Sequence, residues 1–221
     1  MQSYIDKSDD YFAHARKEIV PLLPPGCPRV LELGCGSGAT LAWLRQTNRA
    51  SHTVGVEISA AAAAIAKRSV DEVYCLDFER DEIKMDDKQF DLVLCLDVLE
   101  HLVDPWTVLD RLVSQYLAVG GTLIVSVPNV RHYGVVLPLL LAGRWEYADA
   151  GILDRTHLRF FTRNSAIQLL THSQLAAPSC IATGFDGFSR KGIFNALTLG
   201  FFREFVTYQY FLAAAKVSSL D

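Results

Sequence analysis

The chain has 221 residues, of which half are hydrophobic and about a fifth are charged. This composition is typical of a globular domain and excludes a disordered or fibrous chain. A formal net charge of -4 argues against a basic surface for nucleic acid, which is not expected as a partner.

The N-terminal stretch MQSYIDKSDDYF has acidic residues where a signal peptide carries a basic start and an apolar centre. A cytoplasmic location is therefore expected. Within residues 1–28, apolar positions recur at helical spacing from Asp9 to Leu23, and the stretch PLLPPGCP, with four prolines and a glycine, breaks the pattern. An N-terminal helix followed by a linker is predicted there.

Residues 29–129 alternate short apolar strands with helical segments. The strand candidates read RVLELG, HTVGVEIS, EVYCLD, FDLVLCLDVL and GGTLIVSVPN in chain order. Ser59 is a candidate cap for the alanine-rich helix, and Pro105 lies near the start of the helix that follows the fourth strand. Continuous apolar strands that alternate with helices indicate a parallel sheet covered on both faces. A doubly wound α/β fold is therefore predicted.

Beyond the fifth strand candidate the pattern loosens. Residues 130–175 combine a helix-like stretch, an irregular polar and aromatic stretch and a second helix, an arrangement typical of a lid or substrate region. Residues 176–221 contain two more strand candidates and an intervening helix. Because these strands lack a crossover of the earlier type, the final strand is expected to be antiparallel.

The expected architecture is one domain over residues 1–221, with a Rossmann-like, mostly parallel sheet of about seven strands. A helical and loop lid is inserted after the fifth strand, and residues 29–129 form the cofactor-binding core. Charged residues interrupt the apolar C-terminal region, and a membrane helix would bury each at a cost of roughly 2.5–3.5 kcal/mol. No membrane partner is therefore expected.

The stretch LELGCGSGAT places three glycines, Gly34, Gly36 and Gly38, at alternate positions after the first strand. Such a loop can hold a pyrophosphate or a nucleoside. The positions also satisfy the dinucleotide pattern GxGxxG/A, and Glu57 lies roughly where an acid binds ribose. A nicotinamide-dependent oxidoreductase is therefore one alternative.

Acidic residues near the strand ends favour a different ligand. In open α/β sheets, ligands bind at the carboxyl ends of the strands. Glu32, in the first strand, faces a pyrophosphate unfavourably but suits a ligand with an ammonium and a sulfonium group. Asp77 offers an acceptor for the exocyclic amine of adenine. Together with CLDVLEHL after the fourth strand, these features favour S-adenosylmethionine.

The stretches VLELGCGSG, GVEIS, FDLVLCLDVLEHL and GGTLIVSVPN occur in order over residues 29–129. In these motifs the chain resembles the class I S-adenosylmethionine-dependent methyltransferases, close to the bacterial group that includes ubiquinone-biosynthesis O-methyltransferases. The resemblance implies S-adenosylmethionine as the cofactor. It implies that Glu32, Gly34, Gly36, Gly38, Cys95 and Leu96 surround the methionine portion, that Glu57 binds both ribose hydroxyls, and that Ile58, Asp77 and Phe78 hold the adenine.

The acceptor side is expected in the lid, within residues 146–162. A histidine suits a general base near neutral pH. His157 ranks first because the segment after the fifth strand commonly carries acceptor contacts in this family, and His101 ranks second. Asn129, Arg155 and Arg159 are candidate substrate residues. The LDRTHLRFF stretch resembles methyltransferases of glycans and natural products, so the expected acceptor is a small molecule, with a hydroxyl of a sugar or similar metabolite favoured.

Other interpretations of these residues remain open. His101 can brace the helix that follows it, and Arg155, His157 and Arg159 can form an internal salt-bridge network. Asp97 and Glu100 lack a third ligand at a convincing spacing, so no metal is expected. The whole chain can also be a cofactor-binding regulator or partner subunit without catalytic activity. The sequence does not indicate an oligomeric state.

Overall fold

The computed structural model describes residues 14–85, 89–184, 195 and 197–218. Its centre is a seven-stranded sheet with the order β3-β2-β1-β4-β5-β7-β6. The pairs of β1 with β2 and β4, of β2 with β3, and of β4 with β5 are parallel. β7 is antiparallel to both β5 and β6. The strands are β1 (Arg29–Leu33), β2 (His52–Glu57), β3 (Glu72–Cys75), β4 (Phe90–Leu96), β5 (Leu117–Pro128), β6 (Ser179–Thr183) and β7 (Gln209–Ala215).

The predicted fold class is therefore confirmed, including the antiparallel final strand. Several strand boundaries differ from the sequence prediction: β2 ends at Glu57, β3 at Cys75 and β4 at Leu96, each earlier than predicted, and β5 already begins at Leu117. The helical elements are η2 (Lys17–Leu22), α2 (Ala39–Gln46), α3 (Ala60–Ala66), η3 (Leu99–His101), α4 (Pro105–Arg111), η4 (Leu112–Tyr116), α5 (Tyr133–Ala142), α6 (Arg163–Leu169) and α8 (Arg203–Val206).

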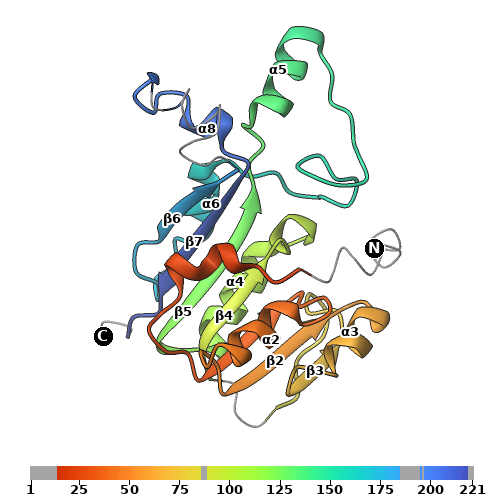
Figure 1. The fold of residues 1–221 in the computed structure, drawn as a ribbon, viewed down its shortest axis with the longest axis vertical. Helices are drawn as coiled ribbons and strands as arrows, with labels where there is room; N and C mark the ends of the chain where they lie inside the picture. The colour runs from red at the N-terminus through yellow and green to blue at the C-terminus, as the bar shows by residue number, and fades with distance from the viewer. Residues whose placement is uncertain (1–13, 86–88, 185–194, 196, 219–221) are drawn as a thin grey trace.

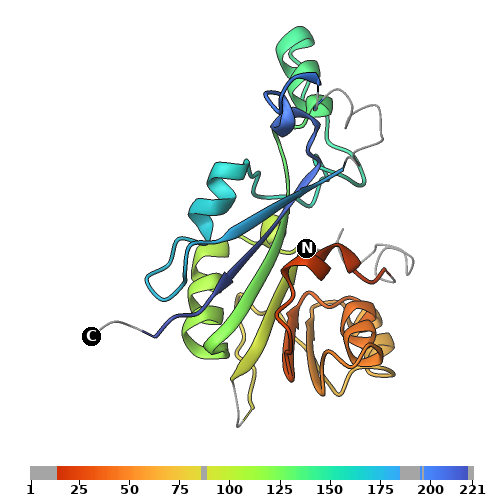
Figure 2. The same ribbon diagram turned by 60° about the vertical axis from the view of Figure 1, so that its left-hand side comes forward.

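Helices cover both faces of the sheet (Figures 1 and 2). An apolar core lies on each side. One core packs η2, α2 and α3 against residues such as Val30 and Leu92. The other packs α4, η4 and α6 against Leu31 and Val93. Neighbouring residues of one strand enter opposite cores because side chains alternate between the faces of a sheet. Continuous apolar strands are thus buried on both sides.

Side-chain caps fix where several helices begin. The Ser59 hydroxyl accepts from the backbone N–H of Ala62 at 3.4 Å, as predicted for the start of α3. Asp104 caps α4, with Pro105 in the first turn. Thr162 and Ser165 form a reciprocal capping box at α6. Each cap satisfies a backbone N–H that has no partner inside the helix.

The N-terminal segment differs from the predicted helix in its described part. Residues 17–22 form a 3₁₀ helix, and Pro21 lies inside it. Proline has no N–H to donate and disfavours a regular α-helix. The earlier part of the predicted helix, residues 9–13, lies outside the described residues.

The segment between β5 and α6 projects from the carboxyl end of the sheet, with α5 at the top of Figure 1. Its two ends meet again, because the N–H of Val130 donates to the carbonyl oxygen of Phe161 at 2.9 Å.

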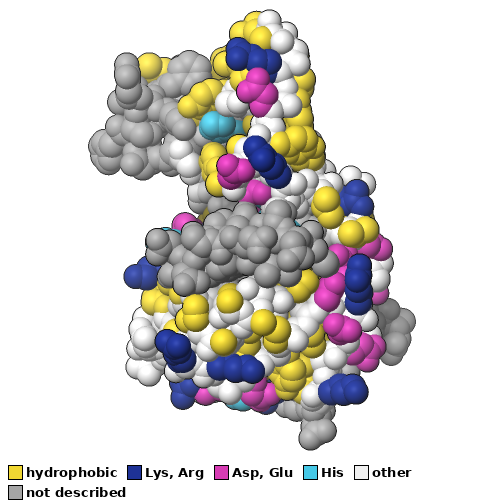
Figure 3. Space-filling model, turned by 90° about the vertical axis from the view of Figure 1, so that its right-hand side faces the viewer, with side chains coloured by type: hydrophobic (Ala, Val, Ile, Leu, Met, Phe, Trp, Pro, Cys, Tyr) yellow, Lys and Arg dark blue, Asp and Glu magenta, His cyan; other side chains and the backbone are white. Residues whose placement is uncertain are grey.

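Among the described residues, every helix is too short or too polar to cross a lipid bilayer. On the face shown in Figure 3, Lys and Arg side chains are scattered among Asp and Glu side chains.

Candidate functional site

The glycine loop between β1 and α2 needs glycine for reasons within the protein. Gly34, Gly36 and Gly38 have φ values of 69°, 54° and 79°, in the left-handed region that favours glycine. A Cβ on Gly34 would lie 2.4 Å from Val98 Cγ2, and a Cβ on Gly38 would lie 2.5 Å from Val70 Cγ2. Backbone conformation and packing inside the protein therefore both require glycine in this loop.

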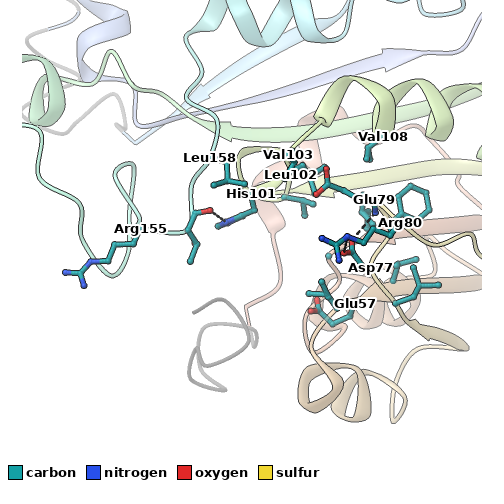
Figure 4. A pocket seen from close by; sticks show the side chains of 18 residues that line it. Glu57, Asp77, Glu79, Arg80, His101, Leu102, Val103, Val108, Arg155 and Leu158 are labelled. Atoms are coloured by element: carbon teal, nitrogen blue, oxygen red, sulfur yellow. Dashed lines mark hydrogen bonds and ion pairs between the residues drawn. The ribbon is translucent and has the colours of Figure 1, made fainter. Parts of the chain in front are cut away.

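Two cavities border this loop and share Gly34. The Glu57 cavity has a volume of about 380 Å³, and the Glu32 cavity has a volume of about 300 Å³. Both volumes suit part of a small ligand in a preformed site. The Glu57 cavity is lined mostly by apolar side chains, with Ile58, Asp77, Phe78 and His101 among the lining residues (Figure 4).

Glu57 holds the glycine loop while it borders the Glu57 cavity. Its carboxylate accepts from the backbone N–H groups of Gly36 at 2.9 Å and Ser59 at 2.8 Å. Burial raises the pKa of this carboxyl, and the backbone hydrogen bonds partly oppose that effect. An ionised carboxylate accepts about four hydrogen bonds, so acceptor capacity is left for a ligand beyond the backbone N–H groups.

Glu32 borders the second cavity with a buried carboxyl group. Its side chain is 3% exposed, and burial raises its pKa to about 8, against the opposing effects of Thr40 and Arg16. Within the described part of the chain, Glu32 Oε2 is buried without a hydrogen-bond partner. A buried carboxylate oxygen of this kind is stabilised by a cationic ligand group. The site therefore fits the ammonium end of S-adenosylmethionine.

Of the remaining residues expected to bind the cofactor, some border one of the two cavities and others border neither. Asp77 and Phe78 border the Glu57 cavity, and Leu96 borders the Glu32 cavity. Asp77 Oδ1 accepts from the backbone N–H of Glu79 at 3.1 Å. Cys95 is fully buried and borders neither cavity. Gly38 likewise borders neither and precedes α2 as its cap residue.

Arg16 and Asp97 also border the Glu32 cavity, and neither is among the residues predicted to bind the cofactor. The Asp97 carboxylate accepts from Ser126 Oγ at 2.8 Å and also binds Arg16 and Gln209. This network joins the N-terminal segment to β5 and β7. Because its members lie far apart in the sequence, no local pattern indicates the contact.

The two histidine candidates lie side by side at the edge of the Glu57 cavity. The ring centroids of His101 and His157 are 4.7 Å apart, in an edge-to-face arrangement. His101 borders the cavity, whereas His157 is buried and does not. Glu100, also buried, precedes His101 in η3. One donor atom from each of these three residues lies within 4.8 Å of the others, so together they can hold a metal ion.

The candidate substrate residues are more dispersed. Asn129 is fully buried, and its side-chain amide donates to the carbonyl oxygens of Glu204 and Thr207 at 2.7 and 2.8 Å. Arg155 borders the Glu57 cavity but extends away from its Glu57 end in Figure 4. Arg159 donates to the carbonyl oxygen of Val103 and borders neither cavity. The structure thus brings Arg155 to the cavity and uses Asn129 and Arg159 in internal contacts.

The family model described as "Methyltransferase domain" matches residues 4–177. The chain belongs to the methyltransferase-domain family. The predicted membership of the class I S-adenosylmethionine-dependent methyltransferases and the predicted cofactor, S-adenosylmethionine, are thus confirmed.

Curated relatives match part of this methyltransferase chain. A ubiquinone biosynthesis O-methyltransferase of Bradyrhizobium diazoefficiens is 32% identical over 168 residues, which are 74% of this chain and 64% of the relative. A trans-aconitate 2-methyltransferase of Deinococcus radiodurans is 32% identical over 160 residues, 72% of this chain and 57% of the relative. The chain thus spans less than two thirds of each relative.

A solved structure of an S-adenosylmethionine-dependent methyltransferase from Archaeoglobus fulgidus has a similar fold. It aligns with a TM-score of 0.63 and 17% identity, covering 97% of both chains. At this identity the similarity establishes the fold.

Proposed function

We propose that this chain transfers the methyl group of S-adenosylmethionine to an oxygen atom of a small-molecule acceptor, with a hydroxyl of a sugar or natural-product-type metabolite as the favoured class. The observation that carries the proposal is the buried Glu32 carboxyl beside the glycine loop, with Glu57 at the end of the next strand. When bound, the cofactor supplies a methyl group bonded to a positively charged sulfur.

The two acids divide the cofactor site. Glu32 is suited to the ammonium group, because an opposite charge stabilises the ionised form of a buried carboxyl. Glu57 and Asp77, which border the other cavity, are suited to the ribose hydroxyls and the adenine amine. A pyrophosphate, in contrast, would place negative charge near Glu32. The acid at this position therefore favours S-adenosylmethionine over a nicotinamide cofactor.

The acceptor enters on the His101 side of the Glu57 cavity. Residues 155–158 contribute three lining residues there, so they shield this side from water. Sequence reasoning ranked His157 first as the base, but the geometry favours His101 as the histidine closest to the acceptor because only His101 borders the cavity. Oxygen as the acceptor atom is supported by the relatives named ubiquinone biosynthesis O-methyltransferase.

Methyl transfer tests this proposal directly. The purified chain is incubated with isotope-labelled S-adenosylmethionine and a fractionated extract of hydroxylated small metabolites, and labelled products are identified by mass spectrometry. Labelled methyl ethers or esters are expected, and Glu32→Gln should reduce their yield. Tight binding of S-adenosylmethionine without any labelled product across the fractions would instead indicate a regulator or partner subunit.

A further inference from the structure

Three side chains with metal-binding atoms converge at the edge of the Glu57 cavity. Glu100 and His101 are neighbours in η3, and His157 comes from the segment between β5 and α6. Their donor atoms all lie within 4.8 Å of one another. The sequence offered Asp97 and Glu100 as acidic candidates without a third ligand. The fold brings His157 to Glu100, whereas the Asp97 carboxylate binds Ser126, Arg16 and Gln209.

Backbone carbonyl groups orient both imidazole rings. His157 Nδ1 lies 2.9 Å from the carbonyl oxygen of Ile152, and His101 Nδ1 lies 3.2 Å from that of Thr156. A carbonyl oxygen only accepts hydrogen bonds, so each Nδ1 carries the proton. In the neutral ring, Nε2 then keeps its lone pair. Metal-binding histidines typically donate their other N–H group to a carbonyl or carboxylate in this way.

The backbone holds the third ligand in place. The N–H groups of Leu158 and Arg159 both donate to the carbonyl oxygen of Glu100, at 2.7 and 3.0 Å. Leu158, which follows His157, is therefore fixed to Glu100, which precedes His101. Glu100 is 1% exposed and His157 is 8% exposed, so the cluster is largely shielded from water. A site prearranged in this manner loses little conformational entropy when it binds a ligand.

We propose that Glu100, His101 and His157 bind a divalent transition-metal ion, with Zn²⁺ as the representative ion. Two imidazoles and one carboxylate are a donor set of catalytic zinc sites, which leave a coordination position open. Imidazole ligands favour Zn²⁺ and its neighbours over Mg²⁺ and Ca²⁺. Because His101 borders the Glu57 cavity, the open position would lie on the side of that cavity.

The metal site deepens the proposed function, and its role toward the acceptor rests on that function. A metal-bound hydroxyl or water has a lowered pKa. An acceptor hydroxyl at the open position would therefore ionise more readily than the same hydroxyl in water. The binding of the ion itself requires neither cofactor nor acceptor.

Zinc binding to the chelator-treated full chain tests the site. Titration against a chromophoric chelator should give one Zn²⁺ per chain, and Co²⁺ should give visible absorption bands of an imidazole-coordinated ion. His157→Ala and Glu100→Gln should each weaken Zn²⁺ binding at least tenfold. His172→Ala, which removes a histidine bonded to Asp110 outside the cluster, is the matched control and should bind Zn²⁺ as the parent does.

Calorimetry with S-adenosylmethionine and thermal melting of the same variants show whether a loss of Zn²⁺ binding comes from the metal site itself or from a loss of folding. Glu100→Gln keeps the size of the side chain, so it informs on the site even if His157→Ala does not fold. Equal Zn²⁺ binding by the parent and Glu100→Gln, or an equal loss in His172→Ala, would overturn the metal site and leave an internal ion-pair network. Failure of methyl transfer with Zn²⁺ binding intact would overturn the proposed function alone.

Discussion

The carboxyl group of Glu32 remains protonated at a pH where most glutamates are ionised, because burial raises its pKa from 4.5 to about 8. A ligand with an ammonium group stabilises the ionised form and lowers this pKa. At neutral pH, cofactor binding should therefore release a proton from the protein. The affinity for S-adenosylmethionine should rise as the pH increases to about 8 and change little above it, because the carboxyl is then already ionised.

Isothermal titration calorimetry over this pH range, in buffers of different ionisation enthalpy, measures both the affinity and the released protons. Glu32→Gln has no carboxyl to titrate and is the control. Its affinity should be lower and nearly independent of pH up to about 8. An equal pH dependence in the parent and in Glu32→Gln would assign the proton to another group.

Glu57 combines a ligand contact with a structural contact, so its removal should affect both. Sequence reasoning predicts that Glu57→Ala weakens cofactor binding by about 1.5–3 kcal/mol and still folds normally. In the structure the same carboxylate accepts from the N–H groups of Gly36 and Ser59. Leaving buried N–H donors without their acceptor lowers the free energy of unfolding by about 1–3 kcal/mol. We therefore expect Glu57→Ala to lower the free energy of unfolding as well.

Urea unfolding and calorimetry on Glu57→Ala and Glu57→Gln distinguish these effects. The glutamine keeps an acceptor oxygen, so it should retain more stability than the alanine. If Glu57→Ala binds S-adenosylmethionine as the parent does, the ribose lies elsewhere.

At the scale of elements, the first five strands could be predicted because each reads as a short, mostly apolar run, and the first four runs lead into glycine or an acid. Such runs are typical of strands buried on both faces. The position of β7 between β5 and β6 depends on pairing between distant residues, for which the sequence shows no local signal.

The sequence also predicts the helix α5, but its apolar residues surround the whole helix and indicate no buried face. Leu140 and Leu141 are 73% and 82% exposed.

Residues 146–162 were predicted to form a lid that presents His157, and their role in catalysis stays a prediction. His157→Ala should lower turnover by roughly 10²–10⁴-fold, which is the usual contribution of a positioned acid or base. We expect a loss on the same scale if His157 acts through the metal site. Its affinity for S-adenosylmethionine should remain nearly unchanged, because His157 borders neither cavity.

Turnover, cofactor affinity and melting temperature are compared between the parent and His157→Ala once an acceptor is known. A fall in all three together would mean that His157 only braces the segment. Unchanged turnover would remove His157 from the mechanism and leave His101 as the histidine candidate.

At the scale of the whole molecule, the carboxyl ends of β1, β2 and β4 bring both cavities to one edge of the sheet. The strand candidates along the chain and the glycine loop predict most of the residues at this edge, including Glu32, Glu57 and Asp77. The contribution of Arg16 could not be predicted, because a tertiary contact across 81 residues brings it to Asp97. The same limit applies to His157, whose proximity to Glu100 follows from the return of the chain after α5.

The central claim is that the glycine loop and its two acids bind S-adenosylmethionine. Calorimetric titration of the purified chain with S-adenosylmethionine, its demethylated product and NAD is the most direct test. The two adenosyl ligands should bind, and NAD should bind far more weakly because it has no ammonium group to pair with the buried Glu32 carboxyl. Tighter binding of NAD than of both adenosyl ligands would contradict the claim.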